Sequence, residues 1–130
     1  MIKILVLGGG KVGSAIAFDL SKNYSVTVAD IDELTLKNLK KRTNIKTILV
    51  DISSTVTLKN TLQPYNLIIS AVPGFMGYKT LQTIIECKKN VVDISFSPED
   101  PLTLNELAIK NNVSVLVDLG VAPGLGNVIF

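Results

Sequence analysis

Apolar runs and amphipathic stretches alternate along the whole chain. The first run, Ile2–Leu7, is rich in β-branched residues and ends at glycine, which is typical of a strand. In the next stretch, Val12–Lys22, apolar residues recur every four positions, as on one face of a helix. The same alternation predicts further strands at Ser25–Ala29, Thr47–Val50, Asn66–Ala71, Asn90–Ile94 and Val113–Val117. Further helices are expected from Asp32 to Arg42, from Ser53 or Ser54 to Leu62, over Tyr78–Cys87, from Asp100-Pro101 onward, and after Gly124.

The predicted strands are nearly continuous apolar runs instead of alternating apolar and polar residues. Strands of this kind are buried on both faces, as in parallel sheets that lie between two layers of helices. Six such strands joined by crossover helices predict an α/β fold with a doubly wound parallel sheet, in the order 3-2-1-4-5-6. No repeat or internal linker interrupts the pattern, so residues 1–130 are expected to form a single domain.

A glycine-rich segment connects the first predicted strand to the first predicted helix. Residues 8–13, Gly-Gly-Gly-Lys-Val-Gly, fit the pattern G-x-G-x-x-G of dinucleotide-binding Rossmann folds. Gly8 permits the tight turn, Gly10 leaves room for a pyrophosphate, and Gly13 lets the helix pack closely on the strand. The pyrophosphate then sits on free N–H groups at the positive end of the helix dipole, where Lys11 and Val12 are also candidate cofactor residues. Lys11 could lean over the phosphates, or it could be a solvated loop lysine. The alternative is a glycine-rich turn without a ligand.

The cofactor is expected to be NAD, because Asp30 follows the second strand about twenty residues after the glycine loop. An acidic residue at this place accepts hydrogen bonds from the adenosine ribose and repels the 2′-phosphate of NADP. No arginine lies in Ala29–Leu34 to bind that phosphate, so NADP is less favoured. The alternative reading is that Asp30 only caps the following turn.

Two other strand ends supply candidate cofactor contacts. Asp51 follows the third strand and is placed to accept a hydrogen bond from the adenine amino group, with Ile52 against the ring; a plain helix cap is the alternative. Ala71, Val72 and Pro73 end the fourth strand, where the cofactor should run toward its nicotinamide. Here the alternative is a turn that merely stops the strand.

Composition excludes several classes of function. The net charge is +2, and twelve of the thirteen basic residues are lysines spread along the chain, which does not indicate nucleic-acid binding. A single cysteine and no histidine argue against a disulfide framework or a metal centre and leave the catalytic residue unidentified. Without a signal peptide or a long apolar run, the protein is expected to be soluble and cytoplasmic, with no membrane partner.

Four segments together resemble the saccharopine dehydrogenase family, in particular its lysine dehydrogenase and saccharopine-reductase-like branch. They are the glycine loop with Asp30, Ala-Val-Pro-Gly-Phe at 71–75, Val-Val-Asp-Ile-Ser at 91–95, and Gly-Val-Ala-Pro-Gly-Leu-Gly-Asn at 120–127. The last is the most specific, since a generic Rossmann domain does not require it. The resemblance implies hydride transfer at a carbon–nitrogen bond of an amino acid, with NAD or NADPH as the cofactor in different members.

The resemblance also implies a substrate beside the ends of the fifth and sixth strands. The candidate residues there are Asp93, Ser95, Phe96, Asp118 and Asn127. Each of these residues also has a possible structural role instead of a substrate contact. The two aspartates can order loops, Ser95 and Asn127 can cap helices, and Phe96 can pack between domains. Tyr78 is expected to be a packing residue with a solvated hydroxyl, and Cys87 a structural one.

The chain differs from this family in its length, because members of the family carry a second α/β region after the Rossmann domain. The apolar ending Val128-Ile129-Phe130 leads us to expect a truncated enzyme whose full-length form is a homodimer. Phe75 and Met76 would then lie where the second region docks. The alternative is a regulatory nucleotide-binding module of the potassium-transport type, which has a similar length and often an acidic residue after its second strand.

Overall fold

The computed structural model of the chain describes residues 2–95, 98–117 and 127–129. All six predicted strands are present, within two residues of the expected bounds. They are β1 (Lys3–Leu7), β2 (Ser25–Asp30), β3 (Lys46–Leu49), β4 (Leu67–Ser70), β5 (Asn90–Asp93) and β6 (Val115–Val117). The helices are α1 (Lys11–Leu20), α2 (Glu33–Arg42), α3 (Thr55–Leu62), α4 (Gly74–Glu86), the 3₁₀ helix η1 (Pro101–Leu104) and α5 (Asn105–Lys110).

The strands form one sheet in the order β3-β2-β1-β4-β5-β6-β7. The first six strands are parallel to their neighbours, as predicted, and the order reverses between β1 and β4. The seventh strand, β7 (Asn127–Ile129), corrects the prediction of a final helix, since it pairs antiparallel with β6. A segment containing the β-branched Val128 and Ile129 favours an extended strand, and the open edge of β6 supplies its hydrogen bonds.

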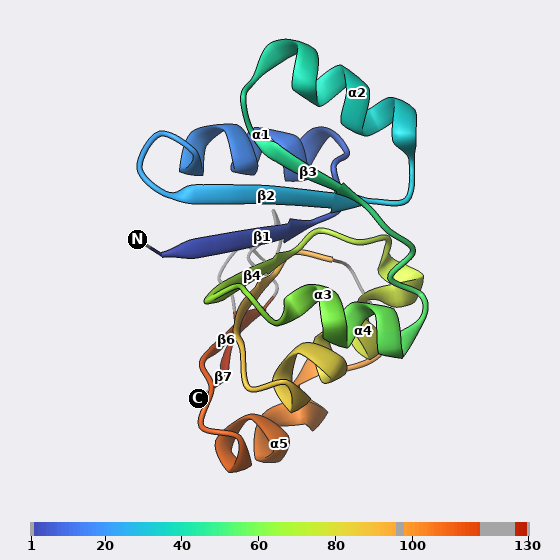
Figure 1. Ribbon diagram of the computed structural model, residues 1–130. Coiled ribbons are helices and arrows are strands. Elements are labelled where there is room, and N and C mark those ends of the chain that lie inside the picture. The colour runs from blue at the N-terminus through green and yellow to red at the C-terminus, as the bar shows by residue number, and fades with distance from the viewer. Residues whose placement is uncertain (1, 96–97, 118–126, 130) are drawn as a thin grey trace.

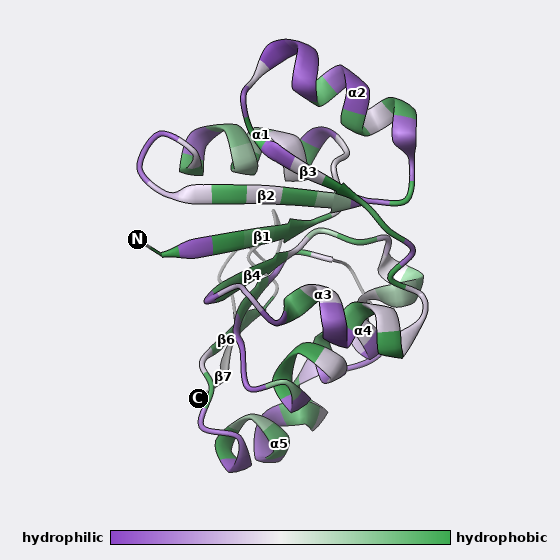
Figure 2. Cartoon of the chain, in the orientation of Figure 1, coloured by the Kyte–Doolittle hydropathy of each residue, from purple (hydrophilic) through white to green (hydrophobic). Residues whose placement is uncertain are grey.

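Helices cover both faces of the sheet, with α1 and α2 on one face and α3, α4 and α5 on the other (Figure 1). Each face has its own buried cluster. Leu5, Ile68 and Ile84 belong to the cluster under α3, α4 and α5, while Val6 and Leu39 belong to the one under α1 and α2. Figure 2 shows the central strands largely hydrophobic and α2 largely hydrophilic, as expected for a sheet between two helical layers.

Side-chain caps fix two of the predicted helix starts. Asp32 accepts a hydrogen bond from the Leu34 N–H at 3.0 Å at the start of α2. Ser54, rather than Ser53, caps α3 by accepting from the Thr57 N–H at 3.4 Å. These contacts satisfy N–H groups that a helix leaves without internal partners.

Two helical details differ from the sequence prediction. Helix α4 begins at Gly74 and not at Tyr78, directly after Pro73, which is its N-cap residue with φ of −56° and a non-helical ψ of 146°. Val12 does not face inward, since it is 60% exposed, and the buried face of α1 is centred on Gly13 and Ala17.

The two packing residues noted in the sequence have defined surroundings. The Tyr78 hydroxyl, expected to be solvated, forms a hydrogen bond of 2.6 Å with the Thr103 hydroxyl and so joins α4 to η1. Cys87 is half-buried against the larger core cluster, and this burial raises the pKa of its thiol. In the described part of the chain, no helix combines the length and the apolar character that a membrane crossing requires.

Candidate functional site

A cleft of about 630 Å³ lies at the carboxyl ends of the strands, at the point where the strand order reverses between β1 and β4. Ligands of doubly wound folds bind at such a reversal. Eight of the eleven predicted cofactor residues line this one cleft: Gly8, Gly10, Asp30, Asp51, Ile52, Ala71, Val72 and Pro73. The structure therefore brings together residues from four strand ends that are far apart in the sequence.

The three glycines of the fingerprint have three different environments. Gly8 has a φ of +101°, and a Cβ there would lie 2.5 Å from the Ala71 carbonyl oxygen. A Cβ on Gly13 would overlap the carbonyl oxygen of Gly8, so α1 reaches the loop only because this position has no side chain. A Cβ on Gly10 would meet nothing within 4 Å. Gly8 and Gly13 are thus required by the fold, whereas Gly10 borders open space where a ligand can approach the backbone.

The start of α1 offers donors to that open space. The first α-helical bond runs from the Ser14 N–H to the Gly10 carbonyl at 2.8 Å. The N–H groups of Lys11, Val12 and Gly13 precede this bond, so they have no partner within the helix. No side chain caps Gly10, and the first turn contains no acidic residue but does contain the exposed Lys11. This arrangement suits an anion such as a pyrophosphate.

Asp30 connects the end of β2 to the glycine loop. Its Oδ2 accepts a hydrogen bond from the Gly9 N–H at 2.6 Å, and its Oδ1 accepts from the Asp32 N–H at 2.8 Å. The bond from the Asp32 N–H is the turn cap that was the alternative interpretation of Asp30. The bond from the Gly9 N–H is an additional contact, which ties Asp30 to the glycine loop. Each carboxylate oxygen can accept a second hydrogen bond, so the side chain retains capacity for a ribose hydroxyl.

Asp51 lies at the next strand end, exposed on the wall of the cleft. Its Oδ1 accepts from both the Ser53 hydroxyl, at 2.7 Å, and the Ser53 N–H, at 3.0 Å. These two bonds, the side-chain one first, lower the pKa of the Asp51 carboxyl from its usual value. Asp51 is thus an ionised acceptor near neutral pH, beside the half-buried Ile52.

The proposed substrate-side residues are only partly described. Asp93 is buried at the end of β5, and its Oδ1 accepts from the Ser95 hydroxyl at 2.6 Å and the Ser95 N–H at 2.9 Å, which orders the following turn. Asn127 lies in β7, so its reading as a helix cap is wrong. Phe96 and Asp118 lie outside the described residues.

Sequence reasoning missed several residues of the cleft. The additional lining residues are Ala29, Ile31, Val50, Ser53, Phe75 and Met76. Phe75 and Met76 were expected on a docking surface, but α4 begins early enough to bring both to the cleft. The available signal was their position directly after Pro73-Gly74, in the first turn of the helix that follows the β4 strand end.

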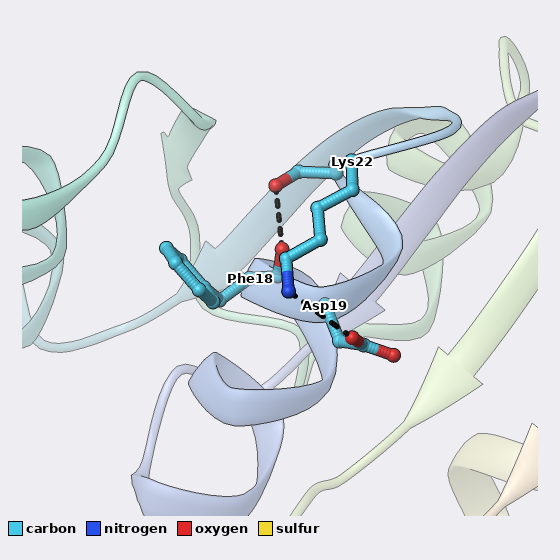
Figure 3. Close-up of polar contacts among 4 residues, drawn as sticks. Phe18, Asp19 and Lys22 are labelled. Carbon is cyan, nitrogen blue, oxygen red and sulfur yellow. Dashed lines mark hydrogen bonds and ion pairs between the residues drawn. The ribbon is translucent and has the colours of Figure 1, made fainter.

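A second hollow, of about 600 Å³, lies on the other side of the glycine loop between α1 and α2. Of the predicted residues it contains only Gly10 and Lys11. At its far end, Phe18 is half-exposed, and the Lys22 ammonium lies 5.4 Å from the centre of its ring. Lys22 is also 3.7 Å from Asp19 (Figure 3), so this aromatic face is already covered by a neighbouring cation. Within the described residues, no cluster of three potential metal ligands occurs.

The fold and the cleft define the class of protein: a Rossmann-type nucleotide-binding domain with an open phosphate loop and an acidic residue at the end of β2. The sequence matches the family description "Saccharopine dehydrogenase NADP binding domain" over residues 4–116. The chain belongs to this family of oxidoreductases, as its four motifs indicated, and the domain binds a nicotinamide cofactor.

The similar proteins agree with this assignment. The mitochondrial alpha-aminoadipic semialdehyde synthase of Rattus norvegicus is 25% identical over 98% of this chain and 14% of its own length. The NADP(+)-dependent, L-glutamate-forming saccharopine dehydrogenase of Saccharomyces cerevisiae is 26% identical over 94% of this chain and 28% of its own length. The apo structure of the L-Glu-forming yeast enzyme superposes with a TM-score of 0.84 over 95% of this chain and 28% of that one, at 25% identity.

A scyllo-inositol dehydrogenase from Lactobacillus casei, solved with bound NAD(H), has a TM-score of 0.72 at 14% identity, over 90% of this chain and 36% of that one. This likeness concerns the fold alone. The chain spans less than a third of the length of the two curated relatives it matches.

Proposed function

We propose that this chain is the NAD-binding part of an oxidoreductase that transfers a hydride at a carbon–nitrogen bond of an amino acid. The observation that carries the proposal is the convergence of Gly10, Asp30 and Asp51 on one cleft, with open space above Gly10. The dinucleotide would supply the hydride acceptor or donor. The chain's own residues would bind the pyrophosphate at the start of α1, orient the adenosine ribose through Asp30, and direct the nicotinamide past Ala71–Pro73.

The preference for NAD rests on the charge beside the ribose position. Asp30 ends β2, Asp32 and Glu33 follow it closely, and the nearby Lys37 is already paired with Glu33 at 3.0 Å. Two unit charges 4 Å apart interact by about 4 kcal/mol at a surface-like dielectric, and solvent screening reduces this for the partly exposed Asp30. A 2′-phosphate would meet this repulsion, whereas a 2′-hydroxyl would donate to Asp30.

Calorimetric titration of the chain with NAD and NADP tests the cofactor proposal. We expect NAD to bind at least ten-fold more tightly at physiological ionic strength. Equal or tighter binding of NADP would refute the preference. Failure of both dinucleotides to bind would refute the site itself.

The substrate class is proposed from the relatives, whose names concern saccharopine and aminoadipic semialdehyde. A spectrophotometric assay at neutral pH with NAD and either saccharopine or lysine tests whether this chain alone suffices for turnover of that class. We expect cofactor binding without turnover by this chain, because hydride transfer needs both carbons held in near contact and the described residues form only one wall of a substrate pocket. Turnover comparable with that of a saccharopine dehydrogenase would overturn this expectation.

A further inference from the structure

Strand β3 forms one edge of the sheet, with β2 as its neighbour on the inner side. The Val50 N–H donates to the Asp30 carbonyl of β2 at 2.9 Å. Because the backbone groups of successive strand residues point in opposite directions, Ile48 also faces β2, whereas Thr47 and Leu49 point their N–H and C=O groups away from the sheet. Among the described residues, no backbone hydrogen bond reaches these two residues from outside the sheet. An unpaired edge of this kind can accept another strand.

The centre of this edge has little protection against such pairing. Natural proteins guard edge strands with charged side chains, proline or bulges. The one charged residue of β3 is Lys46, at the start of the strand, and the following residues 47–49 are uncharged. Leu49 is 56% exposed although it lies in a strand. The strand is short, but its open groups border an uncharged and partly apolar surface.

Two copies of β3 fit each other when they run antiparallel. In such a pair, residues that lie opposite each other either both point their backbone groups at the partner strand or both point them away from it. Thr47 can therefore lie opposite Leu49 of the second copy, and each pair of this kind exchanges two hydrogen bonds. This register places Ile48 on the two-fold axis and Lys46 opposite Val50 of the second copy, so no like charges face each other.

The two neighbouring registers fit the strand less well. An axis at Thr47 would pair Ile45 with Leu49 and would need the outward N–H of Ile45. That N–H already donates to the Thr43 hydroxyl at 3.3 Å. An axis at Leu49 would pair Thr47 with Asp51, which lies beyond the end of β3. The first register is thus the one that uses only free outward groups within the strand.

Helix α2 lies beside the same edge, in contact with β2 and β3. Thr35, Asn38 and Arg42 line the hollow between α2 and α1, so this side of the helix faces α1. Because α1 contacts β1 and β2, residues about half a turn away point in the other direction, outward over the edge of the sheet. These outward residues are Glu33, Lys37 and Lys40.

This outer flank of α2 is self-complementary in charge. A two-fold axis that pairs the strands keeps both α2 helices on the same face of the sheet and makes them antiparallel. Glu33, at the start of one helix, then lies beside Lys40, near the end of the other, and the contact occurs twice by symmetry. Lys37 lies 3.0 Å from Glu33 of its own helix and keeps that carboxylate on the flank. The helix therefore favours the same antiparallel partner as the strand.

We propose that the β3 edge, together with the outer flank of α2, docks a second copy of this chain, so that the sheet continues across a two-fold axis. A short strand and a polar helix flank bury less area than an obligate interface, which makes the dimer weak and reversible. The lining of the cofactor cleft contains no residue of β3 or α2, so each copy keeps its own cleft open. The inference is independent of the proposed function.

Sedimentation velocity at increasing protein concentration tests the strand pairing. The wild-type chain should show a monomer–dimer equilibrium. Thr47→Pro removes an outward N–H but no bond to β2, at a kind of position where edge strands tolerate proline. The loss occurs twice in the dimer and should weaken it by about 5- to 150-fold. Thermal melting checks that the fold of the variant persists.

A charge-swap series tests the helix flank without changing the strand. Lys40→Glu brings like charges together at Glu33 and should weaken the dimer by about 3- to 30-fold. Glu33→Lys should weaken it similarly, and the double variant should recover the wild-type strength because the pair is restored with its signs exchanged. The matched control is Lys110→Glu on α5, away from the β3 edge, which makes the same change in net charge and should leave the dimer unchanged (Figure 1).

A wild-type chain that stays monomeric up to about 1 mM overturns the proposal. A dimer that Thr47→Pro and Lys40→Glu leave intact also overturns it, because another surface would then hold the two copies together. Equal weakening by Lys40→Glu and Lys110→Glu, or a double variant that stays weak, would contradict a specific contact between the helices. If Thr47→Pro fails to fold, the charge-swap series decides alone.

Discussion

Gly10 and Gly13 allow the ligand role of the glycine loop to be separated from its structural role by adding the same methyl group at each position. Gly10 has φ of −67° and ψ of −167°, which any residue can adopt, and a Cβ there meets nothing within 4 Å. On Gly13 the added Cβ overlaps the Gly8 carbonyl oxygen, and Gly8 is itself held to β2 by the hydrogen bond from its N–H to the Ala29 carbonyl at 2.8 Å. The two variants should therefore fail in opposite ways.

The magnitudes follow from these environments. Gly10→Ala restricts the unfolded chain, which stabilises the fold by about 0.4–1 kcal/mol, but replaces glycine by a poorer N-cap, which costs a similar amount. Its net effect on the free energy of unfolding should be within about 1 kcal/mol. Gly13→Ala requires the loop to move, and overpacking of this kind costs about 1–3 kcal/mol. For a chain of this length that lowers Tm by roughly 4–11 °C.

Thermal melting and calorimetry with NAD⁺ measure the two effects separately. Gly10→Ala should melt within about 4 °C of the wild type and bind at least ten-fold more weakly, because its methyl occupies the pyrophosphate's place. Gly10→Val should abolish binding while the fold persists. Wild-type affinity in Gly10→Val would refute the loop as the phosphate site. An unchanged Tm in Gly13→Ala would refute the packing argument.

Four further predictions test single contacts. Asp30→Ala should narrow the affinity gap between NAD and NADP, measured by titration, because it removes the ribose acceptor and the repulsive charge together. Tyr78→Phe breaks the bond to Thr103 and should lower the free energy of unfolding by about 0.5–1.5 kcal/mol in urea, with NAD affinity unchanged. Cys87, whose pKa is raised by burial, should react with a disulfide reagent at pH 8 more slowly in the folded chain than in urea. Because the pKa of Asp51 is lowered, the carboxylate stays ionised at pH 5, so Asp51→Asn should weaken NAD binding by the same factor at pH 7 and pH 5.

The layered fold could be predicted from the sequence because its signals are local. Continuous apolar runs indicate strands buried on both faces, and Asp32 and Ser54 mark helix starts through their own hydrogen bonds. Strand β7 could not be predicted in this way. Its three residues are extended because they pair with β6, a contact between segments that periodicity within one segment does not encode.

The cleft residues that could be predicted are those whose role follows from their position at the end of a strand. Gly8 and Gly10 follow the end of β1 and Asp30 ends β2, and the strand order alone brings them together. Phe75 was placed on a docking surface, because its part in the cleft depends on α4 starting at Gly74 and on its distance to Ile52 across another loop. The pattern of apolar and polar residues along the sequence does not reveal which side chains from two different strand-to-helix connections lie close together.

The choice between NAD and NADP illustrates the limit of inference from family membership. The phosphate loop and the strand reversal serve either cofactor, because both present the same pyrophosphate to the start of α1. In the proposed binding mode, only the end of β2 and the start of α2 would contact the group that differs. This segment carries Asp30, Asp32 and Glu33, and Lys37 is paired with Glu33. The family description names NADP, whereas the preference for NAD that we propose rests on these side chains. On our proposal, the fold and the loop shared over residues 4–116 would serve either cofactor, and the carboxylates at the end of β2 and the start of α2 would select NAD.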